Sequence, residues 1–192
     1  MILPIRLFGD PVLRTRTIKV GDVTDEVEAL IGNMLDTMRN AAGIGLAAPQ
    51  VGRTDRIFVI DIGPLLEDLP ERERQNVPPQ PMVFLNAEII SESEAEEEFE
   101  EGCLSIPDIR ESVIRPEEIR IEYQNRNMEA QSLRIGGFLS RVIQHEYDHL
   151  NGMLFTDHIS AFRRNLLRRR LREIARGEVE AAYPIQVAHA LK

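Results

Sequence analysis

The sequence predicts an α+β fold in which mixed or antiparallel β-sheets surround a central helix, with further helices near the two ends. An amphipathic helical pattern comes first, several short strand-like runs follow it, and two more helical patterns complete the order. The strands do not alternate regularly with helices, as they do in parallel βαβ folds. The 192 residues fit one domain spanning 1–192. We expect residues 178–192 to form an extension after the last helix.

The composition is that of a globular protein, with 43% hydrophobic and 29% charged residues. No apolar run approaches the roughly 18 to 20 residues that cross a bilayer, and the N-terminus lacks the basic and apolar regions of a secretory signal. Cys103 is the single cysteine, which suits a reducing compartment. We therefore expect a cytoplasmic protein without membrane contact. A net charge of −9 argues against a protein that coats nucleic acid as a whole.

The first predicted helix begins after Thr24, a typical N-cap residue, and carries Asp25 and Glu26 where the helix dipole favours acids. Its apolar positions have helical spacing: Val27, Leu30, Ile31, Met34, Leu35 and Met38. We expect this helix to end near Gly43. The small residues of the following segment, 43–50, let the backbone approach another group closely.

Strands are predicted at 56–62, 82–85, 119–123 and 131–135, the last two around a turn at 125–127. Five prolines between Pro64 and Pro81 indicate an exposed loop. Eight glutamates fall within residues 88–101, and their alternation would give an extended segment one acidic face.

A second helix is predicted at about 138–150 and a third at about 160–176. Residues 163–176 of the third helix hold seven arginines and one acid. Two interpretations stay open for this basic helix: a solvated face, or a surface that contacts a polyanion. In the first interpretation, five apolar residues pack inward: Phe162, Leu166, Leu167, Leu171 and Ile174.

The second helix contains His145-Glu146-Tyr147-Asp148-His149, an H-E-x-x-H pattern. The two histidines lie on one helix face, about 6 Å apart along the axis, so both imidazoles can reach one metal ion. Glu146 lies between them, where it can take a proton from water. The apolar neighbours of the motif indicate a core helix, in which buried His and Glu need a partner. We therefore predict that the central helix binds metal.

A catalytic metal site needs three protein ligands and an open position. His158 and His189 lie outside the helix and fit surface or capping positions better. Cys103, in a Gly-containing turn, is the better candidate because thiolate is a strong ligand for soft or borderline metals. Spacing alone leaves the choice open. Asp148 could orient a ligand or a neighbouring Arg, or could be an ordinary polar position.

Three segments in this order resemble the peptide deformylase family: Gly43-Ile-Gly-Leu-Ala-Ala-Pro-Gln50, Glu101-Gly-Cys-Leu-Ser105 and Gln144-His-Glu-Tyr-Asp-His-Leu-Asn-Gly152. The resemblance covers nearly the whole chain. It implies a metal-dependent hydrolase that removes the formyl group from the N-terminal formyl-methionine of new polypeptides and releases formate.

The resemblance also implies a role for each residue of the motifs. Cys103, His145 and His149 would hold one divalent metal ion, naturally Fe²⁺, which Zn²⁺, Ni²⁺ or Co²⁺ can replace. Glu146 would be the general acid/base, while the side-chain amide of Gln50 and the backbone N–H of Leu104 would stabilise the oxyanion. The substrate-binding residues would be Gly45 along the peptide groove, Ile44, Glu101 and Val142 around the methionine, and Arg110, which lies outside the motifs.

The family resemblance adds partners as well: formyl-methionyl nascent peptides, and ribosomal RNA near the nascent-chain exit for the basic helix 160–176. We expect a monomer. Two other classes of protein remain as alternatives. H-E-x-x-H alone would suit a zinc protease that cuts internal peptide bonds. A ribosome-bound module with a closed structural metal site would need a fourth ligand, for which the sequence offers no good candidate.

Overall fold

The computed structural model describes residues 1–188. His189, for which a surface or capping position was predicted, lies outside these residues. A five-stranded antiparallel sheet has the order β2 (Gly45–Ala47), β3 (Ile57–Ile60), β4 (Met82–Glu92), β7 (Glu118–Gln124) and β8 (Ala130–Gly136). β5 (Glu96–Cys103) and β6 (Ile106–Pro116) form a separate antiparallel pair, and β1 (Ile5–Arg6) pairs in parallel with β9 (Ile185–Gln186). The predicted α+β class is confirmed.

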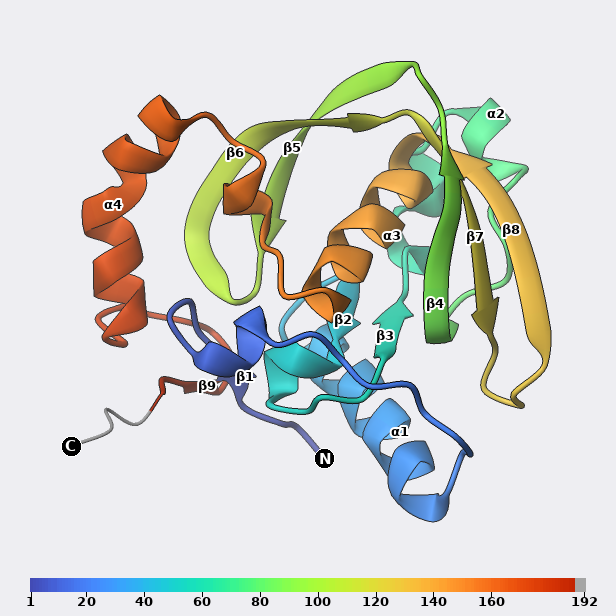
Figure 1. Cartoon of the computed structure of the whole chain (residues 1–192), viewed down its shortest axis with the longest axis horizontal. Helices are drawn as coiled ribbons and strands as arrows, with labels where there is room; N and C mark the ends of the chain where they lie inside the picture. Colours follow the sequence, from blue (N-terminus) through green and yellow to red (C-terminus); the bar gives the residue numbers. More distant parts are fainter. Residues whose placement is uncertain (189–192) are drawn as a thin grey trace.

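Helix α3 (Gly137–Leu150) occupies the centre, between the five-stranded sheet and the β5–β6 pair (Figure 1). α1 (Asp25–Asn40) covers the end of the sheet near β2 and β3, and α4 (Ala161–Ala175) lies beyond β6 (Figure 1). A one-turn helix, α2 (Glu71–Arg74), lies in the predicted loop 64–81, which also holds a 3₁₀ helix at Gly63–Asp68. None of the helices within residues 1–188 has both the length and the apolar character needed to cross a bilayer.

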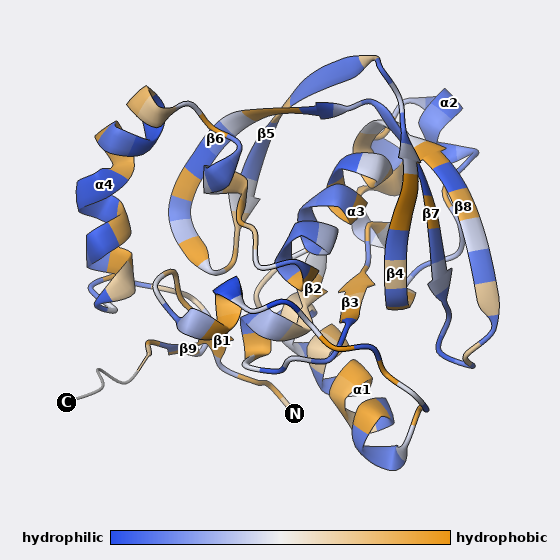
Figure 2. Cartoon of the chain, viewed as in Figure 1, coloured by the Kyte–Doolittle hydropathy of each residue, from blue (hydrophilic) through white to orange (hydrophobic). Residues whose placement is uncertain are grey.

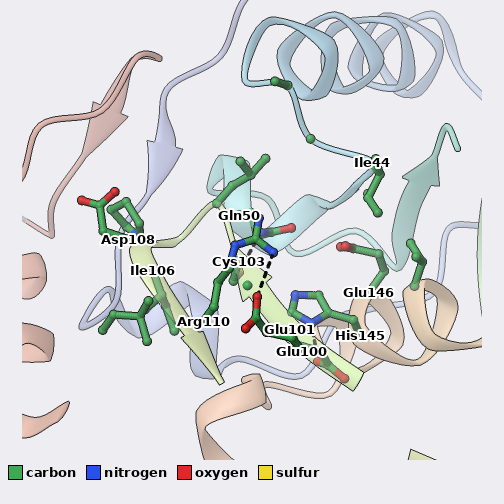
Figure 3. A pocket seen from close by; sticks show the side chains of 18 of the residues that line it. Ile44, Gln50, Glu100, Glu101, Cys103, Ile106, Asp108, Arg110, His145 and Glu146 are labelled. Carbon is green, nitrogen blue, oxygen red and sulfur yellow. Dashed lines mark hydrogen bonds and ion pairs between the residues drawn. The ribbon is translucent and has the colours of Figure 1, made fainter. Parts of the chain in front are cut away.

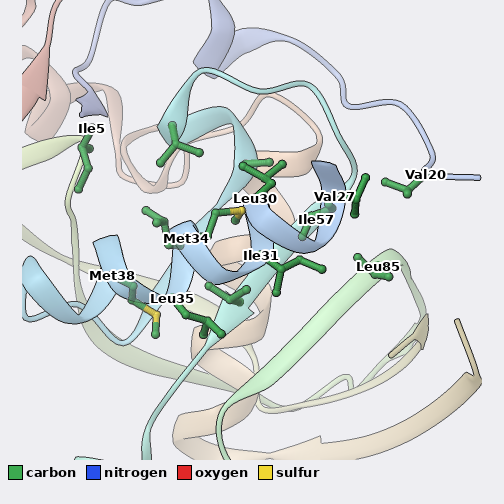
Figure 4. Packing of buried hydrophobic residues seen from close by; sticks show 14 residues of the cluster. Ile5, Val20, Val27, Leu30, Ile31, Met34, Leu35, Met38, Ile57 and Leu85 are labelled. Carbon is green, nitrogen blue, oxygen red and sulfur yellow. The ribbon is translucent and has the colours of Figure 1, made fainter. Parts of the chain in front are cut away.

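The apolar spacing of α1 explains its place in the fold. The hydroxyl of Thr24 accepts the Val27 N–H at 3.4 Å, so the predicted N-cap is present. The helix ends at Asn40, three residues before Gly43, and Ala42 takes the left-handed conformation (φ 51°). Its apolar face packs on β2 and β3 (Figure 4), and residues buried in this cluster include Leu30, Ile31, Met34, Met38 and Ile57. This packing fixes the segment that follows α1 against the sheet.

The apolar positions of α3 face the other side of the sheet. Leu139, Val142, Ile143 and Leu150 are buried with residues of β3, β4 and β7. Burying an apolar side chain of this size contributes about 1.5–3 kcal/mol. The helix is therefore rigidly held, and its opposite face is turned toward β5 and Cys103.

The inward packing predicted for the basic helix is wrong for two residues. Leu171 and Ile174 of α4 are buried, but Phe162 and Leu166 are 71% and 59% exposed. α4 contacts the protein mainly through its C-terminal half, and its surface is largely hydrophilic (Figure 2). The helix therefore presents arginines and two large apolar side chains together.

Candidate active site

Two elements distant in the sequence, β5 and α3, bring Cys103 close to His145 (Figure 3) and to His149. His145 and His149 come from α3, and Cys103 from the end of β5. One ligand atom from each of these three residues lies within 4.8 Å of the other two. Sulfur with two imidazole nitrogens is a donor set that suits Zn²⁺ or Fe²⁺. The structure thus brings together the three predicted ligands, and their chemistry fits a metal ion.

Cys103 is placed by the tight connection between β5 and β6. The strands pair regularly until Gly102 and then shift register, so that Cys103 pairs with Ile106. Its sulfur lies 3.3 Å from Nε2 of His149. Burial would raise the pKa of the thiol, but the two histidines outweigh burial and lower that pKa to about 5. The thiolate, which is the form that binds metals, is therefore favoured.

Glu101 fixes the orientation of His145. Its Oε2 lies 2.8 Å from Nδ1 of His145, which leaves Nε2 as the free ring nitrogen. Its Oε1 accepts hydrogen bonds from Arg115 at 2.7 Å and from Arg141 at 3.0 Å. Burial opposes ionisation of Glu101, but these partners keep the pKa of the carboxyl well below its usual range. Glu101 is therefore a buried carboxylate that holds a ligand in one tautomer.

Asp148 belongs to the same buried network. Its Oδ2 accepts a hydrogen bond from Arg115 at 2.7 Å and lies 2.7 Å from Nε2 of His158. Of the two roles considered for Asp148, the structure shows the one in which it orients a neighbouring Arg. His158 lies in this network rather than beside the three ligands.

Glu146 points into the cavity from α3. Its Oε2 is buried and has no hydrogen-bond partner in the part of the chain that the structure describes. Burial raises the pKa of this carboxyl to about 7. A group with a pKa near neutrality can both take and return a proton at physiological pH.

Gly45 makes room for Glu146. A Cβ on residue 45 would lie 2.7 Å from Cδ and 2.8 Å from Cγ of Glu146, and closer still to Oε1. Gly43 has the same relation to Leu104, whose Cδ1 would lie 2.8 Å from a Cβ at 43. The two glycines are therefore required by close packing against catalytic candidates, which the small residues of segment 43–50 indicated.

Gln50 is oriented by its own backbone turn. The N–H of Ala47 donates to Oε1 of Gln50 at 2.8 Å, so the amide NH₂ faces the other way. That NH₂ lies 3.4 Å from the sulfur of Cys103 and 3.4 Å from the hydroxyl of Ser105. An amide donor is thus held beside the three ligands.

A cavity of about 840 Å³ runs past these groups. Its lining includes all the predicted substrate residues: Ile44, Gly45, Glu101, Arg110 and Val142. Arg110 stands at the exposed rim, with Nη1 4.0 Å from Oε1 of Glu100. Sequence reasoning missed Leu65 and Phe138 in the lining, and also the segment 180–183. No local pattern marks these residues, because they reach the cavity only through tertiary packing.

The profile of the family described as "Polypeptide deformylase" matches residues 2–165. The chain belongs to the peptide deformylase family. A peptide deformylase of Salinibacter ruber is 58% identical over 185 residues, covering 96% of this chain and 94% of that protein.

Solved peptide deformylase structures show the same fold. The Legionella pneumophila enzyme has a TM-score of 0.79 at 36% identity, covering 93% of this chain and 98% of the other. The Ehrlichia chaffeensis enzyme in complex with actinonin has a TM-score of 0.80 at 30% identity, with 93% and 99% covered. The chain is therefore a metal-dependent hydrolase that removes the formyl group from N-terminal formyl-methionine.

Proposed function

We propose that Cys103, His145 and His149 hold one Fe²⁺ ion in the deformylase reaction, with Glu146 as general acid/base. The observation that carries the proposal is the meeting of the three ligand atoms, within 4.8 Å of one another, beside a cavity that Cys103, His145 and Glu146 line. The thiolate donor favours a soft or borderline ion, and Zn²⁺, Ni²⁺ or Co²⁺ could replace Fe²⁺. When bound, such an ion supplies Lewis acidity that polarises a carbonyl and makes water more acidic.

The proton transfers of the reaction are carried out by a side chain of the protein. Glu146 takes a proton from the attacking water, and the new C–O bond forms at the formyl carbon. The same carboxyl returns the proton to the leaving nitrogen as the C–N bond breaks, giving formate and a free amine. Its burial and its pKa of about 7 suit both steps.

Two donors face the oxygen on which negative charge develops. The Gln50 amide is held with its NH₂ toward Cys103 by the Ala47 N–H. The Leu104 N–H follows Cys103 directly in the turn between β5 and β6. Loss of one such donor typically costs about 3–4 kcal/mol of transition-state stabilisation, so Gln50→Ala should lower kcat by about 10² to 10³.

The methionine side chain would enter the apolar part of the cavity. Ile44, Val142 and Phe138 are apolar residues of the lining, and in Figure 3 Glu146 and Ile44 lie on the same side of Cys103. An unbranched thioether fills such a pocket without requiring a polar partner. Gly45 would let the substrate backbone pass close to β2.

Glu146→Gln tests the proposed role of the acid/base. The amide keeps the shape of the side chain but cannot accept a proton, so kcat for formate release should fall by about 10² to 10⁴. Metal content per chain and binding of actinonin, the ligand of the Ehrlichia chaffeensis structure, should stay unchanged. Full activity of Glu146→Gln would refute the role.

A second proposal concerns ribosome contact through α4. Arg164, Arg168 and Arg172 line one hollow on its surface, and the exposed Phe162 and Leu166 lie on the same helix. Other arginines of α4 are paired with acids: Arg163 with Glu111, Arg169 with Glu173, and Arg170 with Asp108 and Glu173. Arg164 also donates to the carbonyls of Asp157 and Ile159, so Arg168 and Arg172 are the two arginines of the hollow that are available to phosphates.

Charge reversal distinguishes ribosome contact from the other interpretation, in which α4 only presents a solvated face. Arg168→Glu with Arg172→Glu should weaken co-sedimentation with ribosomes at low salt, and the difference from wild type should shrink as salt rises, because salt weakens the arginine–phosphate contacts that the wild type makes. The matched control is Arg72→Glu with Arg74→Glu on α2, which lies far from α4 (Figure 1). Equal co-sedimentation of both double variants would contradict ribosome contact through α4.

We further propose that the protein acts as a monomer in the cytoplasm, where its formylated substrates are made. Sedimentation equilibrium at micromolar concentration should give the mass of a single chain, 21.9 kDa. A mass of two chains would contradict the monomer.

A further inference from the structure

The segment that follows α4 turns back toward the active site. Residues 180–183 line the cavity, and the next residues form β9 beside β1 (Figure 1). The Ile5 N–H donates to the Pro184 carbonyl at 2.8 Å, and the Leu7 N–H donates to the Gln186 carbonyl at 3.1 Å. The family profile ends at residue 165, so this segment lies outside the part of the chain that defines the family.

Apolar packing also holds the segment. Val179, Ile185 and Val187 pack against the cluster beneath α4, which includes the buried Leu171 and Ile174. The segment is thus anchored on both sides of residues 180–183. A wall supported in this way can present fixed side chains to the groove.

Tyr183 connects the segment to the active site. Its hydroxyl donates to the carbonyl oxygen of Leu104 at 2.8 Å. Tyr183 and Leu104 both pack against the α1 cluster, and the Leu104 side chain fits against Gly43. Burial raises the pKa of Tyr183 to about 12, so its hydroxyl stays a donor at physiological pH. Leu104 is therefore held through its carbonyl by Tyr183 and through its side chain by Gly43 and the α1 cluster.

The shape of the groove indicates which part of the substrate residues 180–182 can contact. A formyl group ends its substrate, so the peptide can continue only on the side of the methionine. The three ligands and the apolar pocket account for the formyl group and the methionine side chain. The cavity lining also includes Leu104, Asp108 and residues 180–183, and Tyr183 bonds to Leu104. Asp108 lies on the side of Cys103 away from Ile44 (Figure 3). This side of the cavity is left for the residues that follow methionine.

We propose that the C-terminal segment forms a functional wall of the substrate groove. Tyr183 positions Leu104, and residues 180–182 contact the substrate beyond its methionine. The inference rests on the proposed role of the Leu104 N–H. Tyr183 is a positioning residue because it acts through Leu104, whereas Glu180, Ala181 and Ala182 face the peptide directly.

Tyr183→Phe tests the positioning role. Loss of one hydrogen bond corresponds to about a 2- to 12-fold effect. We expect kcat to fall by that factor for formyl-Met-Ala and for longer peptides alike, with KM unchanged and the melting temperature lowered by no more than about 6 °C. Tyr123→Phe is the matched control, because Tyr123 is also partly buried but its hydroxyl has no hydrogen bond within residues 1–188. Its ring lies against Phe84 in a tilted arrangement, which the substitution keeps. Equal kcat for Tyr183→Phe and wild type would overturn the positioning role.

Ala182→Trp tests the contact with the substrate. Ala182 is exposed, so the fold can accept the larger side chain. We expect KM to change at least about 3-fold for formyl-Met-Ala-Ser-Ala, the effect of one modest contact, and to stay constant for formyl-Met-Ala. An unchanged KM for both substrates, or an equal change for both, would overturn the contact.

The design also separates this inference from the proposed function. If the metal-loaded wild type releases no formate, the proposed function fails. If wild type is active and the Tyr183 and Ala182 variants match it on every substrate, only the role of the C-terminal segment fails.

Discussion

Gly45→Ala is the smallest change that should disable the acid/base while leaving the fold in place. The new Cβ would lie 2.7 Å from Cδ and 2.8 Å from Cγ of Glu146, distances that real Cβ atoms essentially never show. All three atoms that it meets belong to the end of the Glu146 side chain, none to backbone. The carboxylate must therefore move away from β2, while the strand and α3 can stay.

The magnitude follows from these contacts. General acid–base catalysis contributes about 10² to 10⁴ in rate, so displacing the carboxylate should lower kcat by about 10² or more. Overpacking a buried site costs about 1–3 kcal/mol. In a chain of this length each kcal/mol lowers the melting temperature by about 2–4 °C. The loss of activity should therefore far exceed the loss of stability.

Formate release from formyl-Met-Ala-Ser, measured beside thermal unfolding, checks this expectation. Gly32→Ala is the matched control, because nothing lies within 4 Å of a Cβ at this position of α1. The control should keep full activity and gain up to about 1 kcal/mol from better helix propensity. A folded Gly45→Ala enzyme with kcat within 3-fold of wild type would refute the placement of Glu146 against β2.

Three further predictions follow from the buried charges and the ligand set. Arg115→Leu leaves Glu101 and Asp148 buried without this partner, which should cost about 3–5 kcal/mol in urea unfolding; a cost below about 1 kcal/mol would contradict the network. Asp157 is partly buried, which raises its pKa, but Arg14 and the Leu154 N–H outweigh burial and lower it. Because the pKa is lower in the folded state, the ionised carboxylate stabilises the fold when the pH is above the unfolded pKa of about 3.9. This stabilisation is lost as the pH falls through the folded pKa. Asp157→Asn should therefore be less stable than wild type at pH 7, and the difference should shrink below about pH 4; a constant difference would contradict it. A chelator should abolish formate release and leave far-UV circular dichroism unchanged, because the three ligands sit on elements held by apolar cores; Ni²⁺ should restore activity, and unfolding by the chelator would instead indicate a structural metal.

Local patterns in the sequence were enough to predict helices α1, α3 and α4 and four strands of the five-stranded sheet, β3, β4, β7 and β8, but they did not mark β2 or β6. The N-cap at Thr24 and the apolar spacing of α1 and α3 are signals within a few residues, and the structure follows them. The H-E-x-x-H spacing worked for the same reason, because 3.6 residues per turn decides which side chains share a helix face.

Features that depend on distant contacts were not predictable in this way. Glu101 was expected beside the methionine, and it does line the cavity, but its partners His145 and Arg141 lie on α3 and its partner Arg115 lies on β6. Phe162 fits an inward-facing helical pattern, yet its side chain is exposed, because the residues that α4 buries are Leu171 and Ile174 in its C-terminal half. The return of residues 180–183 to the groove depends on the pairing of β9 with β1, two strands of two residues each, which are too short to give a periodic signal.

The central claim is that this site cleaves the formyl C–N bond through Cys103, His145, His149 and Glu146. Product analysis of formyl-Met-Ala-Ser, with protein purified anaerobically and with Glu146→Ala and Cys103→Ala beside wild type, tests it most directly. We expect equal amounts of formate and intact Met-Ala-Ser from wild type and little of either from the two variants. Internal cleavage of the peptide, or no formate from a folded and metal-loaded wild type, would contradict the claim.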